Sequence, residues 1–185
     1  MAKSVLGELG NKMKVALVGT VKGADELYDT LFEAVRGNVV AFLTGTGDVA
    51  KAGMGGVKDI VVGAIHAVAE IGVAAGDAVH DIVHAAVKGV AESGGDVGSA
   101  VKHSVRGAIQ GVSDVEGDVV DASVKAVSGA IKGVREVGGD VGRATTDAVT
   151  GAVEAAGEVS QTTVHEVKKT LADSVEGAKD VIHKL

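Results

Sequence analysis

Two consecutive stretches of 22 residues decide the fold of this chain. Val101–Ala122 reads VKHSVRGAIQGVSDVEGDVVDA, and Ser123–Ala144 reads SVKAVSGAIKGVREVGGDVGRA. The same frame holds over residues 57–185, with copies that begin at Val57, Val79, Val101, Ser123, Thr145 and Val167. A fixed internal repeat of this kind sets the geometry of most of the chain.

The apolar residues of each copy recur with the period of an α-helix. Val105, Ile109 and Val112 are spaced by four and three residues, whereas a half-buried strand would require strict alternation. Each copy also divides into two units of 11 residues. Eleven residues in three turns correspond to about 3.67 residues per turn, which favours a gentle right-handed supercoil. We therefore predict an all-α fold.

The apolar side of the predicted helix has two different flanks. The apolar positions cover an arc of roughly 160°, and charged residues occupy the opposite side. One flank carries small residues four positions apart: Gly63 and Ala67, Ala85 and Gly89, Gly107 and Gly111, Gly129 and Gly133, and Gly151 and Ala155. The other flank carries larger residues: Ile65, Val87, Ile109, Ile131 and Val153. Because small residues let helix backbones approach closely, we expect the small flank of one helix to receive the bulky flank of a parallel neighbour.

The absence of proline allows these repeats to form one long, nearly continuous helix. Each interior glycine costs about 1 kcal/mol relative to alanine, so an isolated helix of this composition should not be stable. We therefore expect helices from several chains to pack side by side in a tube, rod or filament. The alternative is an antiparallel bundle of helices of about 40 residues. Its turns would lie near Gly94-Gly95 and Gly138-Gly139, and Asp96 and Asp140 would cap the following helices.

Residues 1–56 differ from the repeat region, residues 57–185, and form the predicted N-terminal segment. Their apolar residues indicate two short helices, the first with Leu6, Leu9, Met13, Leu17 and Val21 and the second with Leu27, Leu31, Val35, Val39 and Phe42. A Gly-Asp-Val motif at residues 47–49 matches the one at residues 95–97, but it is displaced by four residues from the repeat frame. A displacement of four residues is a stutter, across which the apolar stripe can continue.

Residues with catalytic or ligand-binding patterns are scarce. His80 and His84 are four residues apart beside Asp77 and Asp81, a spacing that could hold a divalent metal, although a solvated helix face is the simpler interpretation. We therefore expect no metal, no cofactor, no catalytic residues and no enzymatic activity. A net charge of −7 argues against nucleic-acid binding. We find neither a cleaved signal peptide nor a membrane-spanning segment, and by default we expect a cytoplasmic protein.

Stretches such as VSGAIKGV at residues 127–134 and VTGAVEAA at residues 149–156 carry a resemblance to known families. The 11-residue pattern resembles right-handed hendecad coiled-coil proteins. The Gly/Ala/Val-rich stretches are similar to the amphipathic repeats of synucleins, although the Lys-Thr-Lys-Glu-Gly-Val core of that family is absent. The resemblance implies either multi-helix assembly or a helix that lies on a lipid surface.

These observations lead to two expectations for function. The first is a structural protein that assembles with parallel copies of itself, in a form that could enclose an apolar lumen. The alternative is an amphipathic protein that coats a membrane or a lipid body. The expected partner is therefore a second copy of the chain or, under the alternative, lipid.

Overall fold

The computed structural model describes residues 8–20, 27–45 and 53–185, and every regular element in these ranges is an α-helix. The helices are α1 (Glu8–Thr20), α2 (Leu27–Gly45), α4 (Gly55–Glu70), α5 (Ala75–Glu92), α6 (Val97–Asp114), α7 (Val119–Glu136), α8 (Val141–Val159), α9 (Gln161–Ser174) and α10 (Ala178–Ile182). The all-α prediction is confirmed for this part of the chain. Leu6, Val21 and the motif at residues 47–49 lie outside it.

The predicted long continuous helix is wrong. Helices α5, α6 and α7 have 18 residues each, so a 22-residue period leaves 22 − 18 = 4 residues for each connection. Gly94 and Gly138 end their helices with φ values of 72° and 71°, because glycine adopts this left-handed conformation without steric cost. The turns of the predicted bundle are therefore present, but the helices are half as long as that alternative assumed.

The additional turn falls in the copy that has only one glycine. Glu116 takes the left-handed conformation there, with a φ of 56°. Asp118 then caps α7, since its side chain accepts hydrogen bonds from the backbone amides of Val120 and Asp121, both at 3.0 Å. Every copy thus ends one helix and starts the next.

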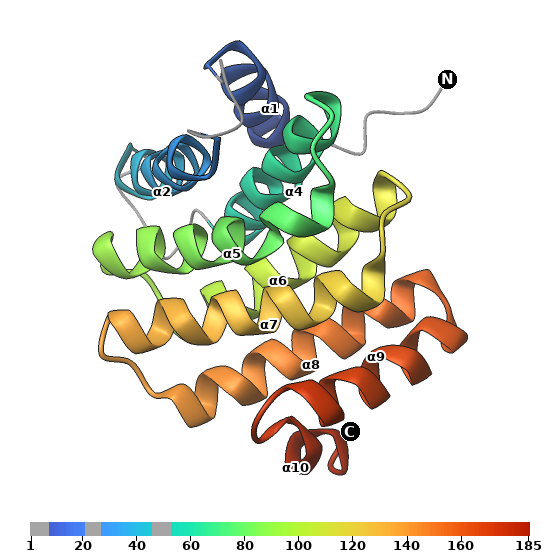
Figure 1. The fold of residues 1–185 in the computed structure, drawn as a ribbon. Coiled ribbons are helices and arrows are strands. Elements are labelled where there is room, and N and C mark those ends of the chain that lie inside the picture. Colours follow the sequence, from blue (N-terminus) through green and yellow to red (C-terminus); the bar gives the residue numbers. More distant parts are fainter. Residues whose placement is uncertain (1–7, 21–26, 46–52) are drawn as a thin grey trace.

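The helices form a two-layer array (Figure 1). One layer contains α1, α4, α6, α8 and α10, and the other contains α2, α5, α7 and α9. Consecutive helices run in opposite directions in opposite layers, whereas helices two apart run parallel in one layer. The ion pair between Asp77 and Lys125 and the hydrogen bond between His84 and Glu136 follow each other in the same order along α5 and α7. Arrays of this kind are typical of α-solenoids.

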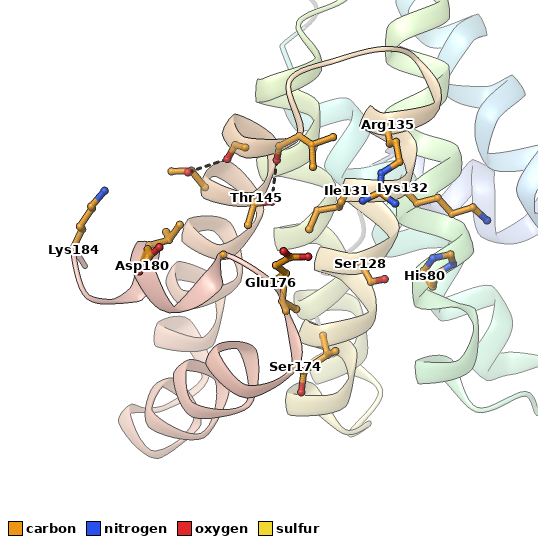
Figure 2. Close-up of a pocket in the computed structure, with 17 residues that line it drawn as sticks. His80, Ser128, Ile131, Lys132, Arg135, Thr145, Ser174, Glu176, Asp180 and Lys184 are labelled. Atoms are coloured by element: carbon orange, nitrogen blue, oxygen red, sulfur yellow. Dashed lines mark hydrogen bonds between the residues drawn. The ribbon is translucent and has the colours of Figure 1, made fainter.

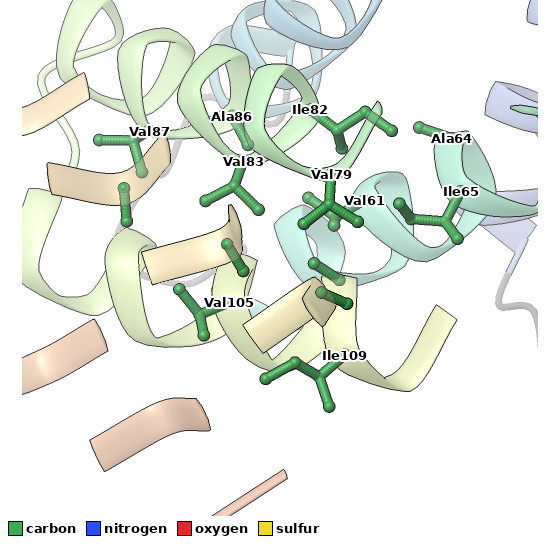
Figure 3. Packing of buried hydrophobic residues seen from close by; sticks show 14 of the residues in the cluster. Val61, Ala64, Ile65, Val79, Ile82, Val83, Ala86, Val87, Val105 and Ile109 are labelled. Atoms are coloured by element: carbon green, nitrogen blue, oxygen red, sulfur yellow. The ribbon is translucent and has the colours of Figure 1, made fainter. Parts of the chain in front are cut away.

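The hydrophobic core lies between the two layers. In Figure 3, Val79 and Val83 of α5 face Val105 and Ile109 of α6. The core runs without a break from Met13 in α1 to Ala178 in α10. The N-terminal helices therefore form the first two members of the array and share its core.

Candidate interaction site: parallel helix contacts and the groove where they stop

The first residue of each small pair lies against the backbone of a parallel helix. A Cβ atom added to Gly107 would lie 2.9 Å from the carbonyl oxygen of Lys58, and one added to Gly151 would lie 3.0 Å from that of Lys102. Gly129 meets the carbonyl of His80 in the same way. A large side chain at these positions would force the helices apart, so this repeat position requires a small residue, and in α5 it is the buried Ala85.

The second residue of each small pair meets a bulky residue of the same parallel helix. A Cβ atom added to Gly111 would lie 2.9 Å from the Cβ of Ile65, and one added to Gly133 would lie 3.1 Å from the Cβ of Val87. The remaining small residues also lie in close contacts or in the core: Gly63, Gly89, Ala67, Ala85 and Ala155.

These contacts join helices of one chain, whereas the sequence analysis assigned them to separate chains. Two four-residue turns in succession reverse the chain twice. A helix thus returns beside the helix two places earlier, in parallel orientation. The glycine-rich helices are covered inside the monomer, and their composition by itself does not require a partner chain.

Ion pairs connect the same parallel helices along their solvent side. Lys14 pairs with Glu70 at 2.6 Å and Arg36 pairs with Glu92 at 2.8 Å. Farther along the array, Lys88 pairs with Glu136 at 3.5 Å, and Arg106 pairs with Glu158. Exposed pairs contribute only about 0–1 kcal/mol each, so they follow the register that the helix packing sets and add little to the stability of the fold.

The register between parallel helices changes once along the chain. Gly107 lies against the carbonyl of Lys58 and Gly151 against that of Lys102, and both separations are 49 residues (107 − 58 and 151 − 102), whereas Gly63 lies against the carbonyl of Gly10, 63 − 10 = 53 residues earlier. The difference of four residues equals the displacement of the Gly-Asp-Val motif at residues 47–49. The stutter therefore shifts the N-terminal helices by one turn without disturbing their packing.

His84 is buried at the junction of α2, α5 and α7, not exposed on a polar face. Its side chain is 6% exposed, and its Nε2 lies 2.9 Å from Oε2 of Glu136. Phe32 of α2 contacts the ring edge-on, with the ring centres 4.9 Å apart. Burial lowers the pKa of His84, and the hydrogen bond to Glu136 opposes this shift in part. Within residues 8–20, 27–45 and 53–185, no group of three acidic, histidine or cysteine side chains is placed to hold a metal ion.

The bulky flank is left uncovered at the C-terminal end of the array. Ile65, Val87 and Ile109 are fully buried, whereas the equivalent Ile131 and Val153 are only partly buried. Helix α9 ends at Ser174 and does not extend along the rest of α7. An open groove of about 850 Å³ remains between α7, the start of α8 and residues 174–184. Figure 2 shows Ile131 and Lys132 on one side of this groove and Asp180 on the other.

Asp173 explains why α9 stops. It occupies the repeat position of Ala85, Gly107, Gly129 and Gly151, where a side chain larger than a methyl group would press against the neighbouring backbone. Helix α9 starts early, after the N-cap Ser160, and residues 175–177 then turn the chain into α10. The sequence analysis missed this break because the repeat frame continues to residue 185. The available signal was an acidic residue in a column that otherwise contains only glycine and alanine.

Comparison with models of known protein families and with curated proteins finds no match to this chain. In the described part of the chain, no helix has both the length and the apolar character needed to cross a membrane.

Proposed function

We propose that this chain is a non-enzymatic structural protein whose folded copies associate head to tail. The observation that carries the proposal is the partial exposure of Ile131 in the groove, at a repeat position where Ile65, Val87 and Ile109 are fully buried. The groove thus presents a bulky flank without the small-residue helix that covers it elsewhere. A helix with small residues four positions apart fits this surface.

Such a row lies exposed on α2. Gly89 packs against Val39 as Gly133 packs against Val87, so Gly37 and Ala41 occupy the small positions of α2. Both residues are exposed, and no atom lies within 4 Å of a Cβ added to Gly37. Among the described helices, α2 is the first of its layer, so no preceding helix covers this row.

A contact between α2 of one copy and the groove of the next joins two different surfaces. Contacts of this kind are heterologous, and they extend into open chains unless a rotation closes them into a ring. This arrangement retains the expected self-assembly, but it uses only the two ends of the array. The lipid-surface alternative has less support, since the apolar helix faces of the described residues lie between the two layers.

Two variants and their mixture test the contact. Gly37→Leu blocks the row, and Ile131→Asp makes the bulky side of the groove polar. Both positions are at least partly exposed, so each variant should fold. In light scattering, the wild-type chain should grow in mass with concentration, and each variant alone should stay monomeric. An equimolar mixture should form a heterodimer and nothing larger, because only one intact row and one intact groove can meet.

Val15→Asp serves as the control, because Val15 is 71% exposed on α1, outside both surfaces. It should associate like the wild type. A wild-type chain that stays monomeric at about 100 μM, far above a micromolar dissociation constant, would contradict the proposal. Association of either single variant by itself would contradict it as well.

A further inference from the structure

Two residues of the C-terminal segment match the repeat in sequence but take different positions in the structure from their equivalents. Gly177 occupies the position of Gly111 and Gly133, yet it forms a turn with a φ of 82°. Asp180 occupies the position of Asp114 and Glu136, yet it lies in α10. If this segment continued α9 along α7, Gly177 and Asp180 would take the same positions beside α7 that Gly133 and Glu136 take beside α5.

The matching residues on α7 are present. Ile131 is the equivalent of Val87, which Gly133 covers. Lys132 is the equivalent of Lys88, which lies 3.5 Å from Glu136. Within the described residues Lys132 makes no ion pair, and Ile131, Lys132, Gly177 and Asp180 all line the same groove.

We propose that residues 175–182 are a strap with two alternative positions, which we call the open place and the closed place. In the open place they fold back as α10, where Ala178 is fully buried. In the closed place they continue α9 along α7, so that Gly177 covers Ile131 and Asp180 pairs with Lys132. Asp173 favours the open place, because its side chain keeps α9 away from the backbone of α7.

Closure of the strap fills the groove from within the same chain. The strap would then compete with a second copy for Ile131 and limit the growth of the assembly. This consequence rests on the proposed function, whereas the two places of the strap do not.

Zero-length cross-linking tests the closed place, because a carbodiimide joins an amine to a carboxylate only where the two groups are in contact. The native Lys132 and Asp180 side chains are the pair, and the amide between them is identified by mass spectrometry of the digested protein. Gly177→Ala should increase the yield of this cross-link about fivefold or more, because alanine disfavours the left-handed turn. Alanine is also accepted at this position in the closed place, as Ala67 and Ala155 show. The cross-link is quantified in the monomer band of dilute protein.

Gly177→Leu is the matched control. Leucine disfavours the turn in the same way, but it is too large to pack over Ile131. It should therefore not increase the yield of the Lys132–Asp180 cross-link. An equal increase with both substitutions would mean that α10 only frays, and no increase with alanine would mean that the closed place does not form. Either result would contradict the strap proposal. Neither result would bear on the head-to-tail contact, which the mixture of Gly37→Leu and Ile131→Asp tests separately.

Discussion

Nε2 of His84 lies 2.9 Å from Oε2 of Glu136, and this contact joins α5 to α7 beside Phe32 of α2. Three helices of one layer thus meet at a single buried imidazole. Lys88, Lys132 and His80 are the other charged or titratable groups near it.

The stability of the fold should decrease when the pH falls below about 6.5, the ordinary pKa of histidine. Burial lowers the pKa of His84 in the folded state, so the unfolded chain binds the proton more readily and acidification favours unfolding. Urea unfolding at pH 7.5 and at pH 5.5 measures the effect. His84→Gln should show a smaller difference between the two pH values, and an unchanged difference would contradict the prediction.

Alanine at the crossing glycines should destabilise the array. In Gly107→Ala the new Cβ would lie 2.9 Å from the carbonyl oxygen of Lys58, and overpacking of this kind costs about 1–3 kcal/mol. Gly37→Ala is the control, because nothing lies within 4 Å of its new Cβ. It should stabilise α2 by up to about 1 kcal/mol. Urea unfolding should therefore move the two midpoints in opposite directions.

Glycine in the turn between α6 and α7 should stabilise the protein. Glu116 has a φ of 56°, and the left-handed conformation costs a non-glycine residue about 1–2 kcal/mol. Glu116→Gly removes this strain and should raise the free energy of unfolding by roughly 1 kcal/mol. Glu166→Gly, inside α9, should instead lower it by about 1 kcal/mol. Equal losses in both variants would show that the turn is not strained.

Truncation at one repeat position should have different costs along the array. Ile109 is fully buried, so Ile109→Ala should cost about 2–5 kcal/mol. Ile131→Ala should cost clearly less, since Ile131 borders the open groove. The comparison is made by urea unfolding at a concentration where the chain is monomeric. Similar losses would indicate that the groove is filled in solution.

The close fit of Gly107 against Lys58 was predictable in kind, because a row of small residues opposite a bulky flank indicates parallel helices at short distance. The burial of His84 was not predictable in the same way. The helical period placed it on the charged side of the helix, whereas in the array α2 and α7 both pack against it. The break at Asp173 was partly predictable, because aspartate differs from the small residues that occupy the same repeat position in the other copies.

The sequence by itself determined the helical period, the small and bulky flanks and the Asp caps, because these depend on contacts within one or two turns. Only the tertiary structure decided that every copy ends a helix, including the copy that turns at Glu116. Glu116 can complete a helix or adopt the left-handed turn, and the layers that form after the turn compensate for its local cost. It also decided that the neighbours of each helix come from the same chain, because connections of four residues bring the chain back beside its own earlier helices.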